Sequence, residues 1–342
     1  MKQIPMVNVR AQTEECGEEL TEAITKVIES GRFIKGEDVE AFEEEWAEYC
    51  GAKYCVSCGN GTDALYLALK AYGIGIGNSV IVPVNSFTAT AEAVSMTGAK
   101  PIFVDCDDNY MMDHTQALLK SRYDTEITLP VDLYGRGAGW TGEISDSCQA
   151  HGLKQTSNVG AYSFFPGKNL GCMGDGGALV TDDKWITDYC NALKDHGRSS
   201  DGYHHNLIGI NSRLDSIQAA VLRVKLKRLD KWNNRRKEIA KKYIDNLNDC
   251  GMLPEYVENH SWHQFVIRVL QRERVREELK EKGIATNVHY PNLIAETYGE
   301  TDLELKYPNA YKFSKEVMSI PIHGCLNDED VDYIIKSIRS VT

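Results

Sequence analysis

The apolar positions near the start of the chain recur at the spacing of amphipathic helices. Over residues 14–30 a single apolar stripe is formed by Leu20, Ile24, Val27 and Ile28. This spacing predicts a helix that ends at Gly31. After the segment GRFIKG the same spacing returns, with glutamates between the apolar positions Val39, Phe42, Trp46 and Tyr49. We expect each helix to pack on a core through one face and to leave the other face in water.

From Lys53 onward, short apolar runs alternate with helical stretches. The expected strands cover residues 54–56, 79–84, 101–105, 127–135, 143–145 and 176–183. Helices are expected between most of them, one beginning with Ser86, Phe87 and Thr88. This alternation predicts an α/β fold with a mostly parallel central sheet covered by helices. Ligands of such sheets bind beyond the carboxyl ends of the strands.

One connection in this pattern is unusually short. Only the segment RGAGWTG, residues 136–142, separates the strand at 127–135 from the strand at 143–145. Parallel neighbours normally need a crossover of a dozen or more residues, although seven extended residues can span roughly 25 Å. A crossover without a helix leaves a patch of the sheet around Trp140 bare. We expect another subunit or a loop to cover it, and a fully exposed Trp140 would contradict this.

The last third of the chain has a different organisation. A long helical tract spans residues 211–247, and the predicted domain boundary lies within it. We expect a large domain over residues 1–225 and a smaller C-terminal α+β domain over residues 226–342. The smaller domain begins with a strand near 263–270 and ends with a helix over 331–341.

Charge and composition exclude several classes of protein. A net charge of −12 argues against general binding to nucleic acid or to an anionic membrane. The N-terminus is too polar for a signal peptide, and no apolar run approaches membrane-spanning length. The ten cysteines are scattered, which indicates reduced thiols and a cytoplasmic protein. Neither the isolated Cys55–Cys58 pair nor the adjacent His204 and His205 has partners at metal-ligand spacing.

The stretch AYSFFPGKNLGCMGD, residues 161–175, carries the strongest candidate for chemistry. Turn-forming and apolar residues surround Lys168, and no charged residue lies within six positions of it. A desolvated lysine has a lowered pKa and a free lone pair, which suits amine chemistry. On this stretch alone, a lysine in a surface turn is an equally good interpretation.

Two further segments suit a ligand site of an α/β sheet. Gly61 and Thr62 open a helix, where free N–H groups and a hydroxyl can hold a phosphate. Asp146, followed by Gln149, stands at the carboxyl end of a strand. Taken alone, the aspartate is better explained as the cap of the following turn.

The ordered set of motifs resembles the DegT/DnrJ/EryC1/StrS family of sugar aminotransferases over nearly the whole chain. The matching segments include GRFIKGEDVEAFEEEW, GNGTDAL, SFTATAEAV, LPVDLYG, SFFPGKNLGCMGDGGALVT, GINSRLDSIQAAV, VHYP and SIPIH. The resemblance implies a type I (aspartate) aminotransferase fold and pyridoxal 5'-phosphate (PLP) as cofactor, present as the pyridoxamine form (PMP) during turnover.

The family pattern implies a role for each matching residue. Lys168 would bind the cofactor as a Schiff base and later carry a proton. Asp146 would pair with the pyridinium nitrogen, Gln149 would contact the ring hydroxyl, and Phe87 would stack on the ring. The phosphate would be held by Gly61, Thr62, Ser163 and, from the neighbouring subunit, Asn211. The resemblance therefore implies a homodimer with shared active sites.

The implied reaction transfers an amino group, usually from L-glutamate, to a keto group at C3 or C4 of a nucleotide-linked deoxysugar. Phe33, Lys35, His289 and Tyr290 match segments that approach this substrate in relatives. For Phe33 and Tyr290 a buried structural role is an equally good interpretation.

The chain departs from the family pattern in two places. It lacks the helix that relatives have between the LYG strand and the Asp146 strand, and its segment after VHYP is shorter than the common HYPIPLHLQ. Two other functions compete with amino transfer. In keto-sugar dehydratases of the superfamily a histidine replaces the lysine, and a sensor or scaffold without catalysis would be expected to lose Lys168, Asp146 or Gln149.

Overall fold

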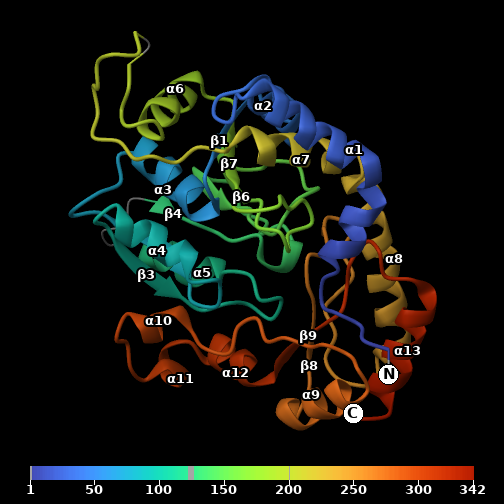
Figure 1. Cartoon of the computed structure of the whole chain (residues 1–342). Coiled ribbons are helices and arrows are strands. Elements are labelled where there is room, and N and C mark those ends of the chain that lie inside the picture. Colours follow the sequence, from blue (N-terminus) through green and yellow to red (C-terminus); the bar gives the residue numbers. More distant parts are fainter. Residues whose placement is uncertain (1, 122–126, 200) are drawn as a thin grey trace.

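The computed structural model describes residues 2–121, 127–199 and 201–342. A central sheet is built from two groups of strands (Figure 1). The first group has the order β3-β2-β4, with β2 at Ser79–Pro83, β3 at Lys100–Val104 and β4 at Ile127–Thr128. The second has the order β1-β7-β6-β5, with β1 at Tyr54–Cys58, β5 at Ile144–Asp146, β6 at Val159–Ser163 and β7 at Gly177–Thr181.

A parallel bridge between Val131 and Asp146 makes the two groups continuous. The backbone N–H of Asp146 donates to the Pro130 carbonyl at 2.9 Å, and that of Asp132 donates to the Asp146 carbonyl at 3.0 Å. Only β7 runs against its neighbours, being antiparallel to both β1 and β6. The mostly parallel sheet confirms the predicted α/β class.

Helices cover both faces of the sheet (Figure 1). Those of the first two-thirds of the chain are α1 (Val9–Ser30), α2 (Glu37–Cys50), α3 (Gly61–Ala71), α4 (Ala89–Met96), α5 (His114–Lys120), α6 (Lys184–Leu193) and α7 (Ser216–Leu226). On one face α2 buries Phe42 and Trp46 completely against Phe164, which follows β6. On the other face α3 and α4 form the largest apolar cluster with β2. Within the described ranges, no helix is both long and apolar enough to cross a membrane.

The expected strand over 127–135 is wrong beyond Thr128. The ladder stops before Pro130, which has no N–H to donate. After the single bridge at Val131, the chain forms a 3-10 turn, η1, at Leu133–Gly135, where Tyr134 has a φ of 60°. This turn directs the chain across the end of the sheet without a helix.

The patch around Trp140 is closed in part by the crossover itself. Trp140 is half-buried and packs on an apolar cluster that includes Ile81, Val104 and Ala117. Its ring lies edge-on to that of His114 at the start of α5, with 4.8 Å between the centroids. The loop therefore covers the sheet face that a helix covers in the family pattern.

The helical tract expected over 211–247 is two helices. Residues before Ser216 are not helical, and Asp215 caps α7 by accepting a hydrogen bond from the Gln218 N–H at 2.9 Å. A break at Lys227 and Arg228 separates α7 from α8, Leu229–Leu247. The predicted boundary between residues 225 and 226 falls at the end of α7.

The C-terminal part has its own small sheet and core. Its elements are β8 (Phe265–Arg268), α9 (Arg272–Glu281), α10 (Ile294–Thr297), α11 (Leu303–Lys306), α12 (Pro308–Glu316), β9 (Val317–Ile320) and α13 (Asp328–Arg339). Strands β8 and β9 pair antiparallel and bury their side chains against α8, α9 and α13.

The segment α10–α12 packs on the large sheet instead. After the short connection that follows Pro291, the Ile294 N–H donates to the Val84 carbonyl at 3.0 Å. The carboxylate of Asp105 accepts hydrogen bonds from the N–H groups of Asn309 at 2.9 Å and Ala310 at 2.8 Å. The two parts are therefore joined along a broad contact.

A buried histidine in the C-terminal part links stability to pH. Burial and the nearby Arg236 guanidinium lower the pKa of His323 to about 4. Within the described residues, neither ring nitrogen of His323 has a hydrogen-bond partner. The folded protein therefore holds this ring in its neutral form at pH 7.

We predict that the free energy of unfolding falls as pH drops from about 6.5 to about 4, because the unfolded chain then binds protons that buried histidines cannot bind. His323→Phe should reduce this loss by up to about 1.4 kcal/mol per pH unit. Urea unfolding at several pH values measures the slope. The matched change His205→Phe, at an exposed histidine, should leave it unaltered, and an equal slope for wild type and His323→Phe would contradict the assignment.

Candidate active site

Lys168 lies in a tight loop between β6 and β7. The Lys168 N–H donates to the Phe165 carbonyl at 2.9 Å, and the Cys172 N–H donates to the Phe164 carbonyl at 2.8 Å. A Cβ on Gly171 would lie 2.5 Å from the Pro166 carbonyl oxygen, so only glycine fits there. The turn formers recognised in the sequence thus hold the lysine in one place.

The Lys168 amine is largely withdrawn from water. Burial lowers its pKa below the ordinary lysine value, and the nearby Cys148 and Asp146 oppose the shift. In the part of the chain that the structure describes, the amine forms no ion pair within 4 Å. A lowered pKa means that the neutral, nucleophilic form is present at lower pH than in an exposed lysine.

Three histidines lie close enough for the Lys168 charge to lower their pKa values, and they stay uncharged at pH 7. Burial and the Lys168 charge lower the pKa of His151 to about 3 and that of His289 to about 4, and lower that of His263 well below its usual value. Neutral rings add no positive charge to the site at pH 7. Among the described residues, no cluster of three metal-binding side chains occurs.

Buried amides fix the residue next to the lysine. The Asn169 carboxamide donates to the Asn233 side-chain oxygen and to the Ser261 carbonyl, both at 2.9 Å. Its oxygen lies 3.1 Å from Nδ1 of His263. Because Ser261 and His263 belong to the C-terminal part, the lysine loop is anchored to it.

Asp146 lies at the carboxyl end of β5, as the sequence predicts. One carboxylate oxygen accepts a hydrogen bond from the Thr90 hydroxyl at 2.7 Å, and the other accepts one from the Cys148 N–H at 3.2 Å. The second contact is the turn cap that the sequence also allowed. Asp146 is buried, and no cationic side chain of the described residues pairs with it. The pyridinium nitrogen of PLP, the cofactor that the resemblance implies, would supply the missing partner.

Gln149 is held with its amide nitrogen on the side of Tyr290. Its side-chain oxygen accepts a hydrogen bond from the Tyr134 N–H at 2.7 Å, and its nitrogen donates to the Tyr290 hydroxyl at 3.2 Å. The Tyr134 hydroxyl donates to the His289 carbonyl. These contacts bring Gln149, His289 and Tyr290 together.

Aromatic and apolar side chains stand exposed around this group. The rings of Phe87 and Tyr290 have centroids 5.8 Å apart, and Phe87 is 54% exposed. Phe165 and Met173 on the lysine loop are exposed as well. A flat ligand could pack on Phe87, and the exposed rim suits a further covering surface.

Gly61 and Ser163 form a cradle beside the lysine loop. A Cβ on Gly61 would lie 2.6 Å from the Ser163 Cβ and 2.9 Å from the Cys148 sulfur. Asn60 caps α3 by accepting from the Asp63 N–H at 2.8 Å, which leaves the N–H groups of Gly61 and Thr62 at the helix start. This donor set fits a phosphate.

Phe33, Lys35 and Asn211 do not join this group within one chain. Lys35 pairs with the Asp195 carboxylate at 2.6 Å, and Asp195 and Asn211 form a backbone bridge. Phe33 and Asn211 are exposed. Asn211 belongs to the segment between α6 and α7, which projects from the body at the upper left of Figure 1, and the Phe33 carbonyl accepts a hydrogen bond from the Ser216 N–H at 2.9 Å, where that segment ends.

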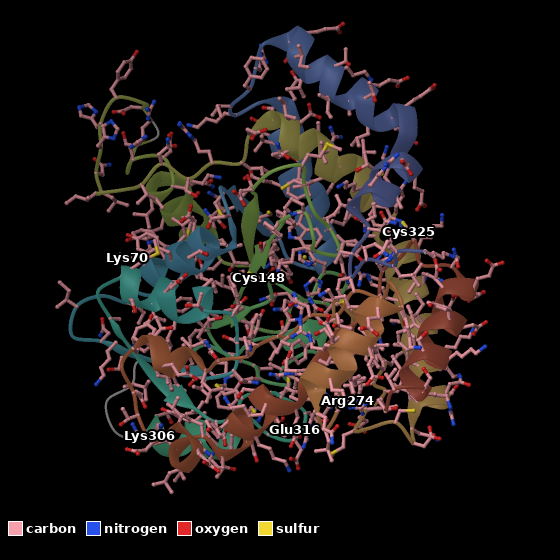
Figure 2. All side chains as sticks on the ribbon, turned by 60° about the horizontal axis from the view of Figure 1, so that its bottom comes forward. Lys70, Cys148, Arg274, Lys306, Glu316 and Cys325 are labelled. Carbon is pink, nitrogen blue, oxygen red and sulfur yellow. The ribbon has the colours of Figure 1, made fainter. Side chains whose placement is uncertain are left out.

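Sequence reasoning missed several residues of the site. Thr90 could have been found, because it follows Ser86 by one helical turn. In the sequence, Cys148 stands between the predicted site residues Asp146 and Gln149. In Figure 2 it lies near the middle of the view, whereas Lys70 and Lys306 lie at the edge. Tyr134 gave no signal, because its role depends on a left-handed backbone conformation.

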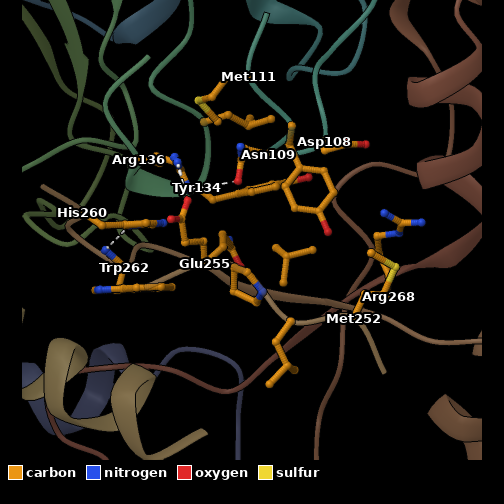
Figure 3. Close-up of a pocket in the computed structure, with 16 residues that line it drawn as sticks. Asp108, Asn109, Met111, Tyr134, Arg136, Met252, Glu255, His260, Trp262 and Arg268 are labelled. Atoms are coloured by element: carbon orange, nitrogen blue, oxygen red, sulfur yellow. Dashed lines mark hydrogen bonds and ion pairs between the residues drawn. The ribbon is translucent and has the colours of Figure 1, made fainter. Parts of the chain in front are cut away.

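A separate small cavity is lined in part by Tyr134 (Figure 3). It has a volume of about 50 Å³ and is lined by residues of both parts of the chain. Arg136 crosses it and contacts the side-chain oxygens of Asn109 at 3.2 Å and Glu255 at 3.3 Å. This space suits one or two water molecules and carries no predicted site residue.

Comparison with known proteins gives one consistent family. The model of the DegT/DnrJ/EryC1/StrS aminotransferase family matches residues 14–339. The chain is 37% identical to dTDP-3-amino-3,4,6-trideoxy-alpha-D-glucose transaminase of Streptomyces venezuelae, over 98% of this chain and 95% of that protein. It is 34% identical to UDP-2-acetamido-2-deoxy-3-oxo-D-glucuronate aminotransferase of Pseudomonas aeruginosa, over 98% of this chain and 100% of that protein.

Solved structures share the whole fold. The crystal structure of S. venezuelae DesV in complex with a ketimine intermediate matches with a TM-score of 0.94 and 36% identity, over 99% of this chain and 98% of DesV. NtdA from Bacillus subtilis with bound cofactor PMP matches with a TM-score of 0.92 and 29% identity, over 100% of this chain and 85% of NtdA. The predicted aminotransferase fold is therefore confirmed.

We predict that Gly61→Ala disrupts the cradle. The new methyl group collides with Ser163 and Cys148, so PLP should bind at least about 10-fold more weakly, and the free energy of unfolding should fall by about 1–3 kcal/mol. Fluorescence titration with PLP and urea unfolding measure the two effects. Gly75→Ala, whose Cβ would have its nearest neighbour at 3.7 Å, is the matched control. Wild-type affinity in Gly61→Ala would rule out a ligand at this cradle.

Proposed function

The chain belongs to the DegT/DnrJ/EryC1/StrS aminotransferase family, and on that premise we propose that it aminates a keto group, at C3 or C4, of a nucleotide-linked deoxysugar. The proposed amino donor is L-glutamate and the proposed cofactor is PLP. One observation carries the proposal: the Lys168 loop follows β6 and the buried Asp146 ends the neighbouring strand β5, and neither side chain is neutralised by an ion pair within the described residues.

The residues present fit PLP at each of its polar groups. Bound there, PLP would supply an electron sink and a carrier for the amino group. The Gly61–Ser163 cradle would hold the phosphate, and Asp146 would keep the ring nitrogen protonated by pairing with it. Lys168 would anchor the cofactor covalently through its amine.

Lys168 Nζ is the proposed proton carrier. Because burial lowers its pKa below the ordinary lysine value, the amine gives up its proton more readily than an exposed lysine, which suits a group that accepts and returns one proton. The neutral histidines around it do not compete for that proton. The lysine loop, anchored through Asn169, holds Nζ in place between the two transfers.

Gln149 and Phe87 would orient the ring, and four residues would meet the sugar substrate. The Gln149 amide donates one N–H to the Tyr290 hydroxyl and keeps a second N–H that can donate to an oxygen on the cofactor ring. For the substrate we propose contacts with Phe33, Lys35, His289 and Tyr290. His289 is neutral at pH 7, and its Nδ1 lies 2.7 Å from the Ser319 hydroxyl, which fixes the ring plane.

We further propose a homodimer with shared active sites. The apolar rim of Phe87, Phe165 and Met173 stands exposed in a single chain, as does Ile208 on the projecting segment. Exposed apolar surface of this kind marks an interface. A second copy that covers the rim would bring its own Asn211 to the phosphate cradle.

Two broader proposals accompany this function. We retain the division into a large domain, residues 1–225, and a small domain, residues 226–342, because the break between α7 and α8 lies at this boundary. We place the protein in the cytoplasm, because its ten cysteines are free thiols and most are buried.

We predict that the purified protein with PLP shows a visible absorbance band that L-glutamate moves toward the near ultraviolet. Lys168→Ala should fail to form the normal band and should lower the rate of amino transfer by about 10²–10⁴-fold. Absorbance spectra before and after glutamate measure this. Lys120→Ala, at another lysine whose pKa burial lowers, should behave as wild type. A wild type that takes up no PLP, or ignores every amino donor, would favour the scaffold or the dehydratase.

We predict that two inactive variants complement each other if the sites are shared. In a mixture of Lys168→Ala and Asn211→Ala chains, a heterodimer has one site with both native residues, so about one quarter of all sites regain activity. Activity after mixing, unfolding and refolding measures this, with the concentration dependence of the mass by light scattering. A mixture no more active than its parts would place Asn211 and Lys168 in the same chain's site or exclude Asn211 from it.

A further inference from the structure

A chain of buried hydroxyl groups ends on the Asp146 carboxylate. The Ser86 hydroxyl lies 2.9 Å from the Thr90 hydroxyl, which lies 2.7 Å from the carboxylate oxygen. Ser86 is 2% exposed and Thr90 is fully buried. Ser86 directly precedes Phe87, and Thr90 lies in the first turn of α4. One short segment therefore carries Phe87, which would stack on the cofactor ring, and Thr90, which contacts Asp146.

The direction of these hydrogen bonds follows from the groups themselves. An ionised carboxylate can only accept, so the single hydroxyl proton of Thr90 points at Asp146. The Thr90 oxygen then accepts the proton of Ser86. The Thr90 hydroxyl is thereby oriented, and the single Ser86 proton is shared between the Thr90 oxygen and the Phe87 carbonyl oxygen, which lies 3.2 Å from the Ser86 oxygen.

Thr90 departs from the ordinary behaviour of threonine in a helix. A helical threonine usually returns its hydroxyl to the carbonyl one turn earlier. Thr187 on α6 does so, donating to the Asp183 carbonyl at 2.9 Å. Thr90 instead donates out of its helix, to a strand 56 positions away in sequence. The Thr90 hydroxyl therefore forms its hydrogen bond with Asp146 and not with its own helix.

A hydrogen-bond donor to the Asp146 carboxylate matters because a second buried carboxylate lies nearby. A second buried carboxylate, Asp132, is close enough for the Asp146 charge to contribute to raising the pKa of Asp132 to about 6. Asp132 accepts hydrogen bonds from the Ala138 N–H at 2.8 Å and the Ser147 hydroxyl at 2.7 Å. Two acids out of water repel each other in their charged forms, and hydrogen bonds to a charged carboxylate favour that form.

We propose that Thr90 is a positioning residue for the reaction: its hydroxyl, oriented by Ser86, holds the Asp146 carboxylate in place for the ring nitrogen of the cofactor. The inference rests on the proposed function, because it needs a cofactor with a protonated ring nitrogen. It adds that Ser86, Thr90 and Asp146 together, not Asp146 alone, would hold the proton on the ring nitrogen of the cofactor. The same segment carries Phe87, so ring stacking and ring protonation are set together.

The test compares Thr90→Val, which keeps the shape and removes the donor, with Thr90→Ser, which keeps the donor. Apo protein is titrated with PLP, and the visible band of each saturated variant is followed from pH 6 to 9. We expect Thr90→Val to bind PLP about 10–100-fold more weakly, because it loses a hydrogen bond to a charged group. Its band should change with pH at a different midpoint, and Thr90→Ser should restore both properties.

Thr187→Val, which removes a buried threonine hydroxyl on α6, is the matched control and should leave affinity and midpoint unchanged. Ser86→Ala should weaken PLP binding by a smaller factor, about 3–10-fold, because Thr90 keeps its donor and loses its orientation. If Thr90→Val does not fold, Ser86→Ala and Thr90→Ser decide the question alone.

Three results would overturn the inference. One is wild-type affinity and midpoint in Thr90→Val, another is an equal loss in Thr90→Ser, and the third is wild-type behaviour of Ser86→Ala when Thr90→Val does not fold. Failure of the proposed function is distinct, since the wild-type protein itself would then bind no PLP or give no response to amino donors.

Discussion

The arrangement of this molecule depends on holding a lysine amine and a carboxylate out of water without letting them form an ion pair. Removing either group from water is unfavourable, so each needs its own support. Asp146 obtains it from a hydroxyl and a backbone N–H at the end of β5. Lys168 responds by a lowered pKa, and the histidines around it stay neutral. The sheet, the glycine turns and the buried amides all keep the Lys168 amine and the Asp146 carboxylate apart.

The same requirement explains why the site is open in a single chain. In a single chain Lys168 is partly buried, and Phe87 and Phe165 beside the site are exposed. The enclosed cavity near Arg136 lies elsewhere and is too small for such a ligand. In the proposed homodimer, a second copy would close the site without a lid and would link association to chemistry.

Much of the fold followed from periodicity, because amphipathic helices and buried strands have distinct spacings. Local sequence left a surface turn as an equal interpretation for Lys168 and favoured a turn cap for Asp146, so their proposed roles came from the family resemblance. The strand over 127–135 was overextended, because Pro130 interrupts the ladder and Tyr134 takes a left-handed conformation that its residue type does not announce. The contact of Thr90 with Asp146 joins distant positions and required the structure. The places of Phe33 and Asn211 depend on a second chain.

The amide network of Asn169 has a consequence for how such proteins can diversify. Its hydrogen bonds reach Asn233 on α8 and Ser261 just before β8, so the loop that bears the lysine is seated on the part of the chain that follows residue 226. A C-terminal half taken from a relative would therefore hold the lysine loop only if it kept the hydrogen-bond partners of Asn169 at positions 233 and 261. Recombination between relatives is thus constrained at these interior amides.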